Sequence, residues 1–499
     1  MKTEKYDVAI IGAGLGGLLC GSILAREGMK VCVLEKNEKT GGSLQIFARE
    51  KCIFNTGLNY TEGLSEDQIL FKYFKFFGIH DKLKLKLMDV DGFERITFQG
   101  REYKFAQGEQ LFTETLIKDF PEEAQSIRFY VQTLKNICYQ FPLYNLDIPD
   151  DALPDYNTLY GQSAVEFIQS VTSNKTLQNV LAGNNLLYAG VADKTPLYLH
   201  ALITYTFISS AWRITDGSQH MATLIGKNIT DAHGTILRNF EVSRLISSNG
   251  RIQCAESKDG RCIEAEHFIS NIHPAGTLKL IEEGHFGPFY RKRIQNLENT
   301  TGMFTVYMVM KENSFPYMNH NHYYYEGDSV WTADKSFGDE WPQSFFLYTP
   351  STSRSEQFAD GLIAMSYMQW DEIKQWEHTF IEQRGEDYLM FKQQKAEKLI
   401  NLVEKKFPGI RKKIKSYYTS TPLTWRDYTG TPNGSAYGIL KDYNSPLKTL
   451  VMPKTRIPNL FFTGQNLNVH GILGVSIGAL MTCGELLGLK YLMDKVRER

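Results

Sequence analysis

The chain has 499 residues and a formal net charge of −1 at pH 7, and 42% of its residues are hydrophobic. This length exceeds one ordinary core and predicts two or three domains or subdomains, while the balanced charge argues against a nucleic-acid partner. No apolar run reaches the ~18 residues that a membrane-spanning helix needs, and the seven scattered cysteines, none in a CxxC pair, predict buried free thiols in a reducing compartment.

The first predicted element is an apolar strand, Tyr6–Ile11, which leads directly into a glycine-rich turn at residues 12–17 (GAGLGG). A helix, a second apolar strand at Lys30–Leu34 and the acid Glu35 follow. This order is typical of a dinucleotide-binding βαβ unit. The turn lets the backbone at Gly14 approach a pyrophosphate, and the helix N-terminus offers free N–H groups to the phosphates. The acid is placed to accept hydrogen bonds from an adenosine ribose.

The next part of the chain, residues 65–210, is predicted to be mostly helical, with periodic stretches at Gln125–Tyr139 and Ala164–Ser170. The proline-containing segment Asp147–Tyr160 is expected to form a loop or lid. The apolar segment Leu199–Trp212 is expected to be a buried helix, with insertion into a membrane surface as the less favoured alternative.

The second half of the chain alternates between short strands and helices. The predicted strands are Thr235–Leu237, Val242–Ser247, Arg251–Glu256, His267–Ser270, Met303–Lys311, Leu362–Gln369 and Leu460–Thr463, and the predicted helices are Met221–Ala232, Glu386–Phe407 and Val475–Lys490. Nucleotide-binding patterns lie at both ends of the chain and again near residues 216–275. We therefore expect an α/β fold with a discontinuous nucleotide domain (1–95, 215–300 and 445–499) and an inserted substrate domain (96–214 and 301–444).

Two segments carry a resemblance to a known family. From Gly12 the chain reads GAGLGG…LEKNEKTGGSLQIF…FNTGLNY, and near its end it reads NLFFTGQNLNVHGILGVSIGAL. Both resemble the amine-oxidase-like flavoproteins, and most closely the FAD-dependent phytoene desaturases, carotenoid isomerases and retinol saturases. The resemblance implies a Rossmann-like FAD domain of the glutathione-reductase type, an α+β substrate domain and a non-covalent FAD.

The resemblance also implies which residues contact the cofactor. Glycines of the first turn would wrap the pyrophosphate, Glu35 would hold the ribose, and the C-terminal segment would lie beside the flavin ring. Where many relatives have Asp-x-Gly-x-His, this chain has amides at both positions, Asn55 and Asn59. The implied cofactor-binding residues are Gly12, Gly14, Gly16, Gly17, Glu35, Lys36, Gly41, Gly42, Ser43, Asn55, Gly57, Leu58, Val242, Gly464, Gln465, Gly474 and Val475.

Chemistry at a C=C bond needs a dry, well-positioned pocket and a route for one proton. The candidate catalytic residues are His470, Tyr428 and Asn59, with Tyr437 as a further candidate. The two tyrosines are more simply interpreted as wall residues. We expect no metal site, because the pair His320 and His322 lacks a third ligand. The GxSxG match at residues 474–478 is interpreted as chance, because no strand runs directly into its serine and no histidine follows it.

These features favour an FAD-dependent oxidoreductase that saturates a C=C bond of an isoprenoid or polyene lipid, as retinol saturases do. Desaturation and carotenoid cis–trans isomerisation are the alternatives, and a non-catalytic prenyl-lipid escort protein is the rival from another class. An amine oxidase is a weaker rival. A single GxGxxG predicts an external electron donor or acceptor. An apolar substrate predicts peripheral contact with a membrane, so we expect a cytoplasmic protein at the inner face of the membrane.

Overall fold

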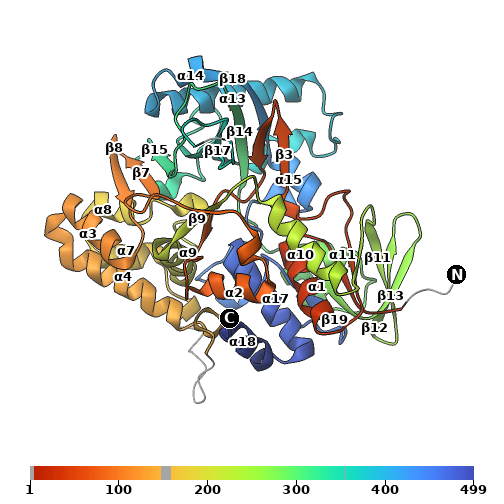
Figure 1. Ribbon diagram of the computed structural model, residues 1–499. Coiled ribbons are helices and arrows are strands. Elements are labelled where there is room, and N and C mark those ends of the chain that lie inside the picture. The colour runs from red at the N-terminus through yellow and green to blue at the C-terminus, as the bar shows by residue number, and fades with distance from the viewer. Residues whose placement is uncertain (1–4, 148–158, 355) are drawn as a thin grey trace.

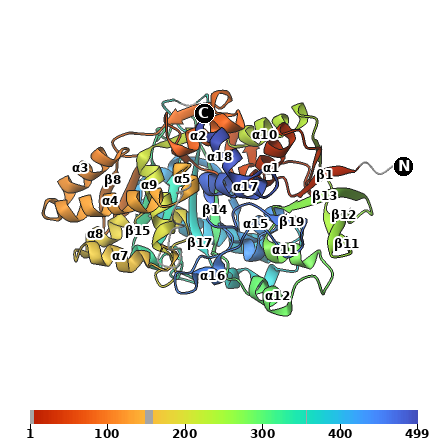
Figure 2. The ribbon, with the colours of Figure 1, turned by 90° about the horizontal axis from the view of Figure 1, so that it is seen from below.

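The computed structural model describes residues 5–147, 159–354 and 356–499, and it confirms the α/β class. Its main features are two seven-stranded sheets and a group of helices (Figure 1). Viewed from below, the helical group lies at one end of the molecule, the β-hairpins of the first sheet lie at the other, and the second sheet lies between them (Figure 2). Most of the predicted loop Asp147–Tyr160 falls outside the described residues.

The first sheet is built around β1, which pairs in parallel with β2 on one side and β13 on the other. Its strand order is β10-β2-β1-β13-β12-β11, with β19 also paired in parallel to β13. The strands are β1 (Tyr6–Ile11), β2 (Val31–Leu34), β10 (Thr235–Leu237), β11 (Val242–Ser248), β12 (Arg251–Ser257), β13 (Cys262–Ser270) and β19 (Leu460–Phe462). The chain therefore returns to this sheet from three separate regions.

Helices from distant regions cover this sheet. The helix α1 (Leu15–Arg26) packs against α10 (Gln219–Asp231) and α17 (Gly471–Leu487), and Figure 1 shows α1 and α10 side by side. The C-terminal helix begins at Gly471, four residues before the predicted start. It ends at Gly488, whose φ of +92° is a conformation that L side chains rarely adopt, and α18 (Leu489–Arg497) follows.

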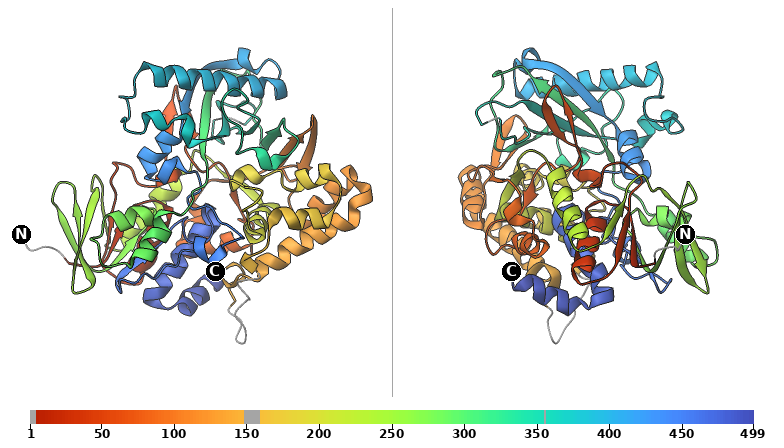
Figure 3. Two further views of the ribbon diagram at one scale, coloured as in Figure 1. Left: turned by 180° about the vertical axis from the view of Figure 1, so that it is seen from behind. Right: turned by 45° about the vertical axis from the view of Figure 1, so that its right-hand side comes forward.

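The second sheet has the order β18-β14-β17-β16-β15-β7-β8. One face packs against α13 (Glu386–Lys406), which lies across the top of the sheet in the rear view of Figure 3. The opposite face joins the main core. The strands are β7 (Glu94–Phe98), β8 (Arg101–Phe105), β14 (Gly302–Met310), β15 (Asn321–Tyr325), β16 (Ser344–Tyr348), β17 (Gly361–Met368) and β18 (Ile414–Ser420).

The helical group surrounds one buried helix, α9 (Leu197–Ser209), whose residues from Leu197 to Ile208 are all buried. This confirms a buried helix in the predicted segment Leu199–Trp212, but the helix ends at Ser209, and Ala211 and Trp212 belong to the strand β9. Among the described residues, no helix is both long enough and apolar enough to cross a bilayer. The other helices of the group are α3 (Glu109–Asp119), α4 (Ala124–Tyr139), α5 (Pro142–Asn145), α7 (Ala164–Val171) and α8 (Lys175–Leu181).

Short elements connect these layers. They are β3 (Ile46–Arg49), β4 (Cys52–Asn55), β5 (Thr61–Glu62), α2 (Ile69–Phe77), β6 (Leu85–Leu87), β9 (Ala211–Ile214), α11 (Pro274–Lys279), α12 (Pro288–Gln295), α14 (Ile410–Lys413), α15 (Pro422–Thr429) and α16 (Pro446–Thr449).

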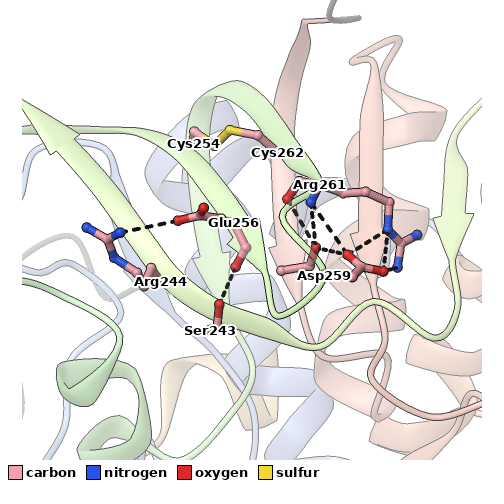
Figure 4. Close-up of a disulfide and its surroundings, with 8 residues drawn as sticks. Ser243, Arg244, Cys254, Glu256, Asp259, Arg261 and Cys262 are labelled. Carbon is pink, nitrogen blue, oxygen red and sulfur yellow. Dashed lines mark hydrogen bonds and ion pairs between the residues drawn. A yellow bond between two sulfur atoms is a disulfide. The ribbon is translucent and has the colours of Figure 1, made fainter.

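The expectation of free thiols is wrong for one pair of cysteines. Cys254 and Cys262 form a disulfide across the β12–β13 hairpin, with a Cα–Cα distance of 6.0 Å (Figure 4). The turn between them is held by Arg261, whose guanidinium donates to both carboxylate oxygens of Asp259. The hairpin brings the two cysteines together, which their separation in the sequence did not indicate. The scattered spacing therefore carries no conclusion about a reducing compartment.

Candidate functional site

A large cleft lies at the carboxyl ends of the parallel strands of the first sheet and reaches the second sheet. Ile11 and Gly12 line it at the end of β1, Leu34 and Glu35 at the end of β2, and Gly464 after β19. Ligands of open α/β sheets bind outside the carboxyl ends of the strands. The topology alone therefore makes this cleft the candidate cofactor site.

The glycine-rich turn gives the cleft a bare backbone wall. Gly12 has a φ of +93°, which favours glycine, and a Cβ at Gly17 would lie only 2.0 Å from the carbonyl oxygen of Gly12. Gly17 is therefore needed for helix packing. Gly14 is the N-cap of α1 and has no side chain to satisfy the first N–H groups of the helix, so these groups are available to an anion in the cleft.

Asn271 joins the two glycine-rich segments from opposite ends of the chain. Its Nδ2 donates to the carbonyl oxygen of Gly12 at 3.3 Å. Its Oδ1 would lie 2.6 Å from a Cβ at Gly16 and 2.5 Å from a Cβ at Gly464. Neither glycine can therefore carry a side chain while Asn271 holds this position. Sequence reasoning missed this residue, and its place directly after β13 is the one signal that pointed to the cleft.

Glu35 is a buried carboxylate whose position is fixed by two backbone N–H groups. Its Oε2 accepts from Ala13 at 2.9 Å and its Oε1 accepts from Asn37 at 2.9 Å. Each carboxylate oxygen has a further acceptor position. Because Glu35 also lines the cleft, the carboxylate can accept hydrogen bonds from the hydroxyls of a bound diol without losing its own support.

A smaller, narrow cavity adjoins the cleft. Most of the wall of this cavity is aromatic or aliphatic. Four residues line both spaces: Asn59, Met303, Met365 and Tyr437. The remaining residues of the small cavity are Leu186, Leu187, Tyr323, Phe346, Ser366 and Tyr367. A polar, glycine-lined cleft thus lies next to an apolar cavity, which suits a nucleotide cofactor beside a lipid.

Most of the residues proposed for cofactor binding come together at this cleft. Those that line it are Gly12, Gly14, Gly16, Glu35, Lys36, Gly41, Gly42, Ser43, Gly57, Leu58, Val242, Gly464, Gln465 and Val475. Three others lie behind the wall. Gly17 packs on Gly12, Gly474 packs on the backbone of Val469, and Asn55 accepts hydrogen bonds through Oδ1 from the backbone and side chain of Ser218.

The candidate catalytic residues lie in three different places. Asn59 lines both the cleft and the small cavity. Tyr428 also lines the cleft but is 48% exposed, and its carbonyl oxygen accepts from Asn37, so it lies at the Glu35 end, away from the apolar cavity. This position favours a wall residue at the rim.

His470 supports the cavity wall and does not itself line either space. Its ring lies on that of Tyr437, with the centroids 4.4 Å apart, and its Nε2 is 3.2 Å from the carbonyl oxygen of Leu187. Burial lowers the pKa of His470 to about 4. The imidazole is therefore neutral near pH 7 and holds Tyr437 and Leu187 in place. Because it does not line the cavity, a direct proton transfer from it to substrate is not expected.

The N-terminus of α17 faces the cleft at Gly471 and Ile472. A buried carboxylate already lies there, because Glu62 Oε1 accepts from the backbone N–H of Leu473 at 3.3 Å. Burial raises the pKa of Glu62. Any ionised fraction of this acid partly cancels the positive potential at the N-terminus of the helix. Further along the same helix, the hydroxyl of Ser476 is buried and donates to the carbonyl oxygen of Ile472, so the GxSxG match is not a nucleophile elbow.

Comparison with known sequences gives similarity over nearly the whole chain. The chain is 26% identical to human all-trans-retinol 13,14-reductase, covering 99% of this chain and 88% of the reductase. It is 24% identical to the chloroplastic prolycopene isomerase of Daucus carota, covering 96% and 80% of the two chains. A family model described as an NAD(P)-binding Rossmann-like domain matches residues 10–77. These similarities confirm the resemblance found in the two terminal segments.

Solved structures support the same fold. An oxidoreductase from Methanosarcina mazei superimposes with a TM-score of 0.65 at 16% identity, covering 96% of this chain and 99% of the other. Putrescine oxidase with bound putrescine superimposes with a TM-score of 0.64 at 12% identity, covering 100% of each chain. At these identities the likeness establishes the architecture, in which a Rossmann-like domain carries a second domain.

Proposed function

We propose that this relative of the retinol saturases and carotenoid isomerases is an FAD-dependent oxidoreductase that reduces a C=C bond of a polyene or isoprenoid lipid. The observation that carries the proposal is that four residues line both the glycine-lined cleft and the apolar cavity: Asn59, Met303, Met365 and Tyr437. A nucleotide cofactor and a lipid can then meet at one shared wall.

The residues that line the cleft suit the parts of FAD. Glu35 and Val242 line it, and the carboxylate suits an adenosine ribose. The bare turn around Gly14 and the free N–H groups of α1 suit a pyrophosphate. Gly464 and Gln465 line the same cleft. When bound there, FAD supplies two-electron hydride chemistry.

The protein itself contributes by positioning the lipid and by excluding water. Aromatic and aliphatic side chains hold the lipid against the shared wall, and a dry pocket suits hydride transfer because proton leakage and side reactions are suppressed. Saturation is favoured over isomerisation because the chain is 26% identical to the retinol reductase over 99% of its length and 24% identical to the prolycopene isomerase over 96%. The electron donor and peripheral contact with a membrane remain part of the proposal.

The test is the mass of the product. Purified protein is loaded with FAD, reduced with dithionite without oxygen, desalted and incubated with all-trans-retinol. We expect a product heavier by two hydrogens. A product of unchanged mass with a new double-bond geometry would favour the isomerase. A protein that binds the polyene but not FAD would contradict the proposal and favour the lipid escort alternative.

A further inference from the structure

A chain of three buried polar side chains leads away from the wall of the apolar cavity. Tyr323 on β15 lines the cavity. Its hydroxyl lies 2.7 Å from that of Tyr60, and the hydroxyl of Tyr60 donates to Glu94 Oε1. Tyr323 also lies 3.4 Å from the same carboxyl oxygen. The three groups are at most 4% exposed, so they form a continuous hydrogen-bonded path from the cavity to a buried acid.

The backbone holds this path rigidly. Glu94 begins β7 and Tyr323 lies on β15, and the two strands pair in parallel with Glu94 in register with Asn321. Tyr60 directly follows Asn59, which lines both the cleft and the cavity. Two paired strands and the loop after Asn59 therefore bring Tyr323 to the cavity wall, with Tyr60 and Glu94 bonded to it behind that wall.

Glu94 has the surroundings of an acid that keeps its proton. It is 0% exposed, and Glu94 Oε2 has no hydrogen-bond partner among the described residues. Among the described residues, four tyrosines have a pKa that the charge of Glu94 would raise: Tyr60, Tyr323, Tyr188 and Tyr325. Arg213 is the cation on this side, and it donates to Asn321 Oδ1. Burial raises the pKa of Glu94 to about 8, so the carboxyl is mostly protonated at pH 7.

We infer that Tyr323 is a catalytic residue that protonates the polyene and that Glu94, acting through Tyr60, returns the proton to Tyr323. The inference rests on the proposed function, because the reduction of a C=C bond requires one hydride and one proton. Tyr323 is the tyrosine that connects the apolar cavity to a buried acid through hydroxyl groups. The proton donor is thus Tyr323, a residue that lies outside the sequence motifs.

The proposed step balances. With FAD held in the cleft, the reduced cofactor would supply a hydride, with its two electrons, to one carbon of the C=C bond, and the other carbon would form a C–H bond with the proton of the Tyr323 hydroxyl. The tyrosinate takes the proton of the Tyr60 hydroxyl, which lies 2.7 Å away. Tyr60 then takes the carboxyl proton of Glu94 after the carboxyl group turns, because before the reaction Tyr60 donates to Oε1 and the carboxyl proton lies on Oε2. Glu94 is left ionised and regains a proton through the same path in reverse, from water that fills the cavity after the product leaves.

The experiment compares Tyr323→Phe, Tyr60→Phe and Glu94→Gln with the control Tyr325→Phe. Tyr325 is also buried on β15, but its hydroxyl bonds to Gly183 and Asn185, outside the proposed path. The reduced, FAD-loaded proteins are reoxidised either by retinol or by oxygen. Reaction with oxygen needs no proton transfer to the polyene. FAD content and the oxygen reaction are therefore expected to stay within about twofold of wild type in every variant.

With retinol, we expect Tyr323→Phe to slow reoxidation by about 10²–10⁴-fold, the usual contribution of a general acid. Tyr60→Phe and Glu94→Gln should slow it about tenfold or more, and Tyr325→Phe by less than threefold. Infrared spectra of the full-length protein at pH 7, without substrate, should show a protonated carboxyl band that disappears in Glu94→Gln and persists in the control.

The outcomes separate the two hypotheses. An active wild type with an equally active Tyr323→Phe would overturn the relay and leave the proposed function standing. Absence of the Glu94 carboxyl band at pH 7 would also overturn the relay, whatever the activity. A wild type that holds FAD but forms no reduced polyene would contradict the proposed function, and the relay with it.

Discussion

Gly14 combines an ordinary backbone conformation with a position on the cleft. Its φ of −70° and ψ of 176° are available to any residue. A Cβ would lie 2.9 Å from Asn271 Nδ2, so Gly14→Val should fold with a shift of the Asn271 side chain while its own side chain projects toward the cleft. We expect FAD content to fall more than tenfold, as measured by absorbance after desalting. Gly327→Val, at a position with free space, is the control. Stoichiometric FAD in Gly14→Val would rule out the pyrophosphate site.

Glu94 should also make stability depend on pH. In the unfolded chain a glutamate ionises near its ordinary pKa of 4.5, while folded Glu94 keeps its proton until about pH 8. The unfolded state therefore binds fewer protons between these values, and the free energy of unfolding should fall as pH rises through this window.

Glu94→Gln removes this titration. We expect urea unfolding at pH 5 and pH 8 to show a loss of up to a few kcal/mol in wild type, and a smaller loss in the variant. Glu283→Gln, at an exposed position, should behave as wild type. Equal pH dependence in wild type and Glu94→Gln would mean that Glu94 is ionised in the folded protein.

His470 should affect substrate binding more than chemistry. His470→Ala removes the ring against Tyr437, a contact of ~1 kcal/mol, so we expect unchanged FAD content and about a fivefold rise in KM for the polyene. Steady-state kinetics separate KM from kcat. A fall in kcat of a hundredfold with KM unchanged would instead give His470 a direct role in proton transfer.

At the scale of elements, Glu62 and α17 act together on the cofactor site. Glu62→Gln keeps a side chain at the backbone N–H of Leu473 but removes whatever fraction of negative charge Glu62 places at the positive end of the helix dipole. We expect the FAD reduction potential to rise by ~10–30 mV, where ~30 mV corresponds to ~1.4 kcal/mol for a two-electron couple.

Equilibration of bound FAD with a redox dye measures this potential. Glu485→Gln, near the far end of α17, is the control and should leave the potential unchanged. A fall in the potential of Glu62→Gln, or equal shifts in both variants, would contradict a local charge effect.

The elements that the sequence predicted well are those with strong local patterns. Tyr6–Ile11 is β1 with unchanged bounds, and α4 and α13 lie within one residue of their predicted ends, because apolar periodicity and glycine or proline stops are local properties. The start of α17 was missed because Gly471 and Gly474 have low helix propensity. Tight packing of Gly474 on Val469 overrides that propensity.

The contacts between distant segments could not be predicted. The Cys254–Cys262 disulfide depends on a hairpin register, and the meeting of Tyr323 with Glu94 depends on β7 pairing in parallel with β15. Asn271 reaches Gly16 and Gly464 only after β1, β13 and β19 assemble. The glycines and Glu35 were accessible from the sequence because their chemistry is encoded by local spacing.

At the scale of the whole molecule, residues from both seven-stranded sheets line the cleft. Parallel strands of the first sheet place the glycine-lined cleft, while Met303 on β14 and Met365 on β17 reach it from the second sheet. Because four residues line both the cleft and the cavity, a cofactor in the cleft and a lipid in the cavity would be neighbours. Neither sheet alone provides both environments.

The most direct test of this central claim is the rate at which reduced, FAD-loaded protein is reoxidised without oxygen when all-trans-retinol is added. We expect the absorbance of oxidised flavin to return in proportion to the retinol added. A product heavier by two hydrogens should form in an amount equal to the flavin reoxidised. FAD that stays fully reduced, with retinol recovered unchanged, would contradict the claim that the cleft and the cavity form one active site.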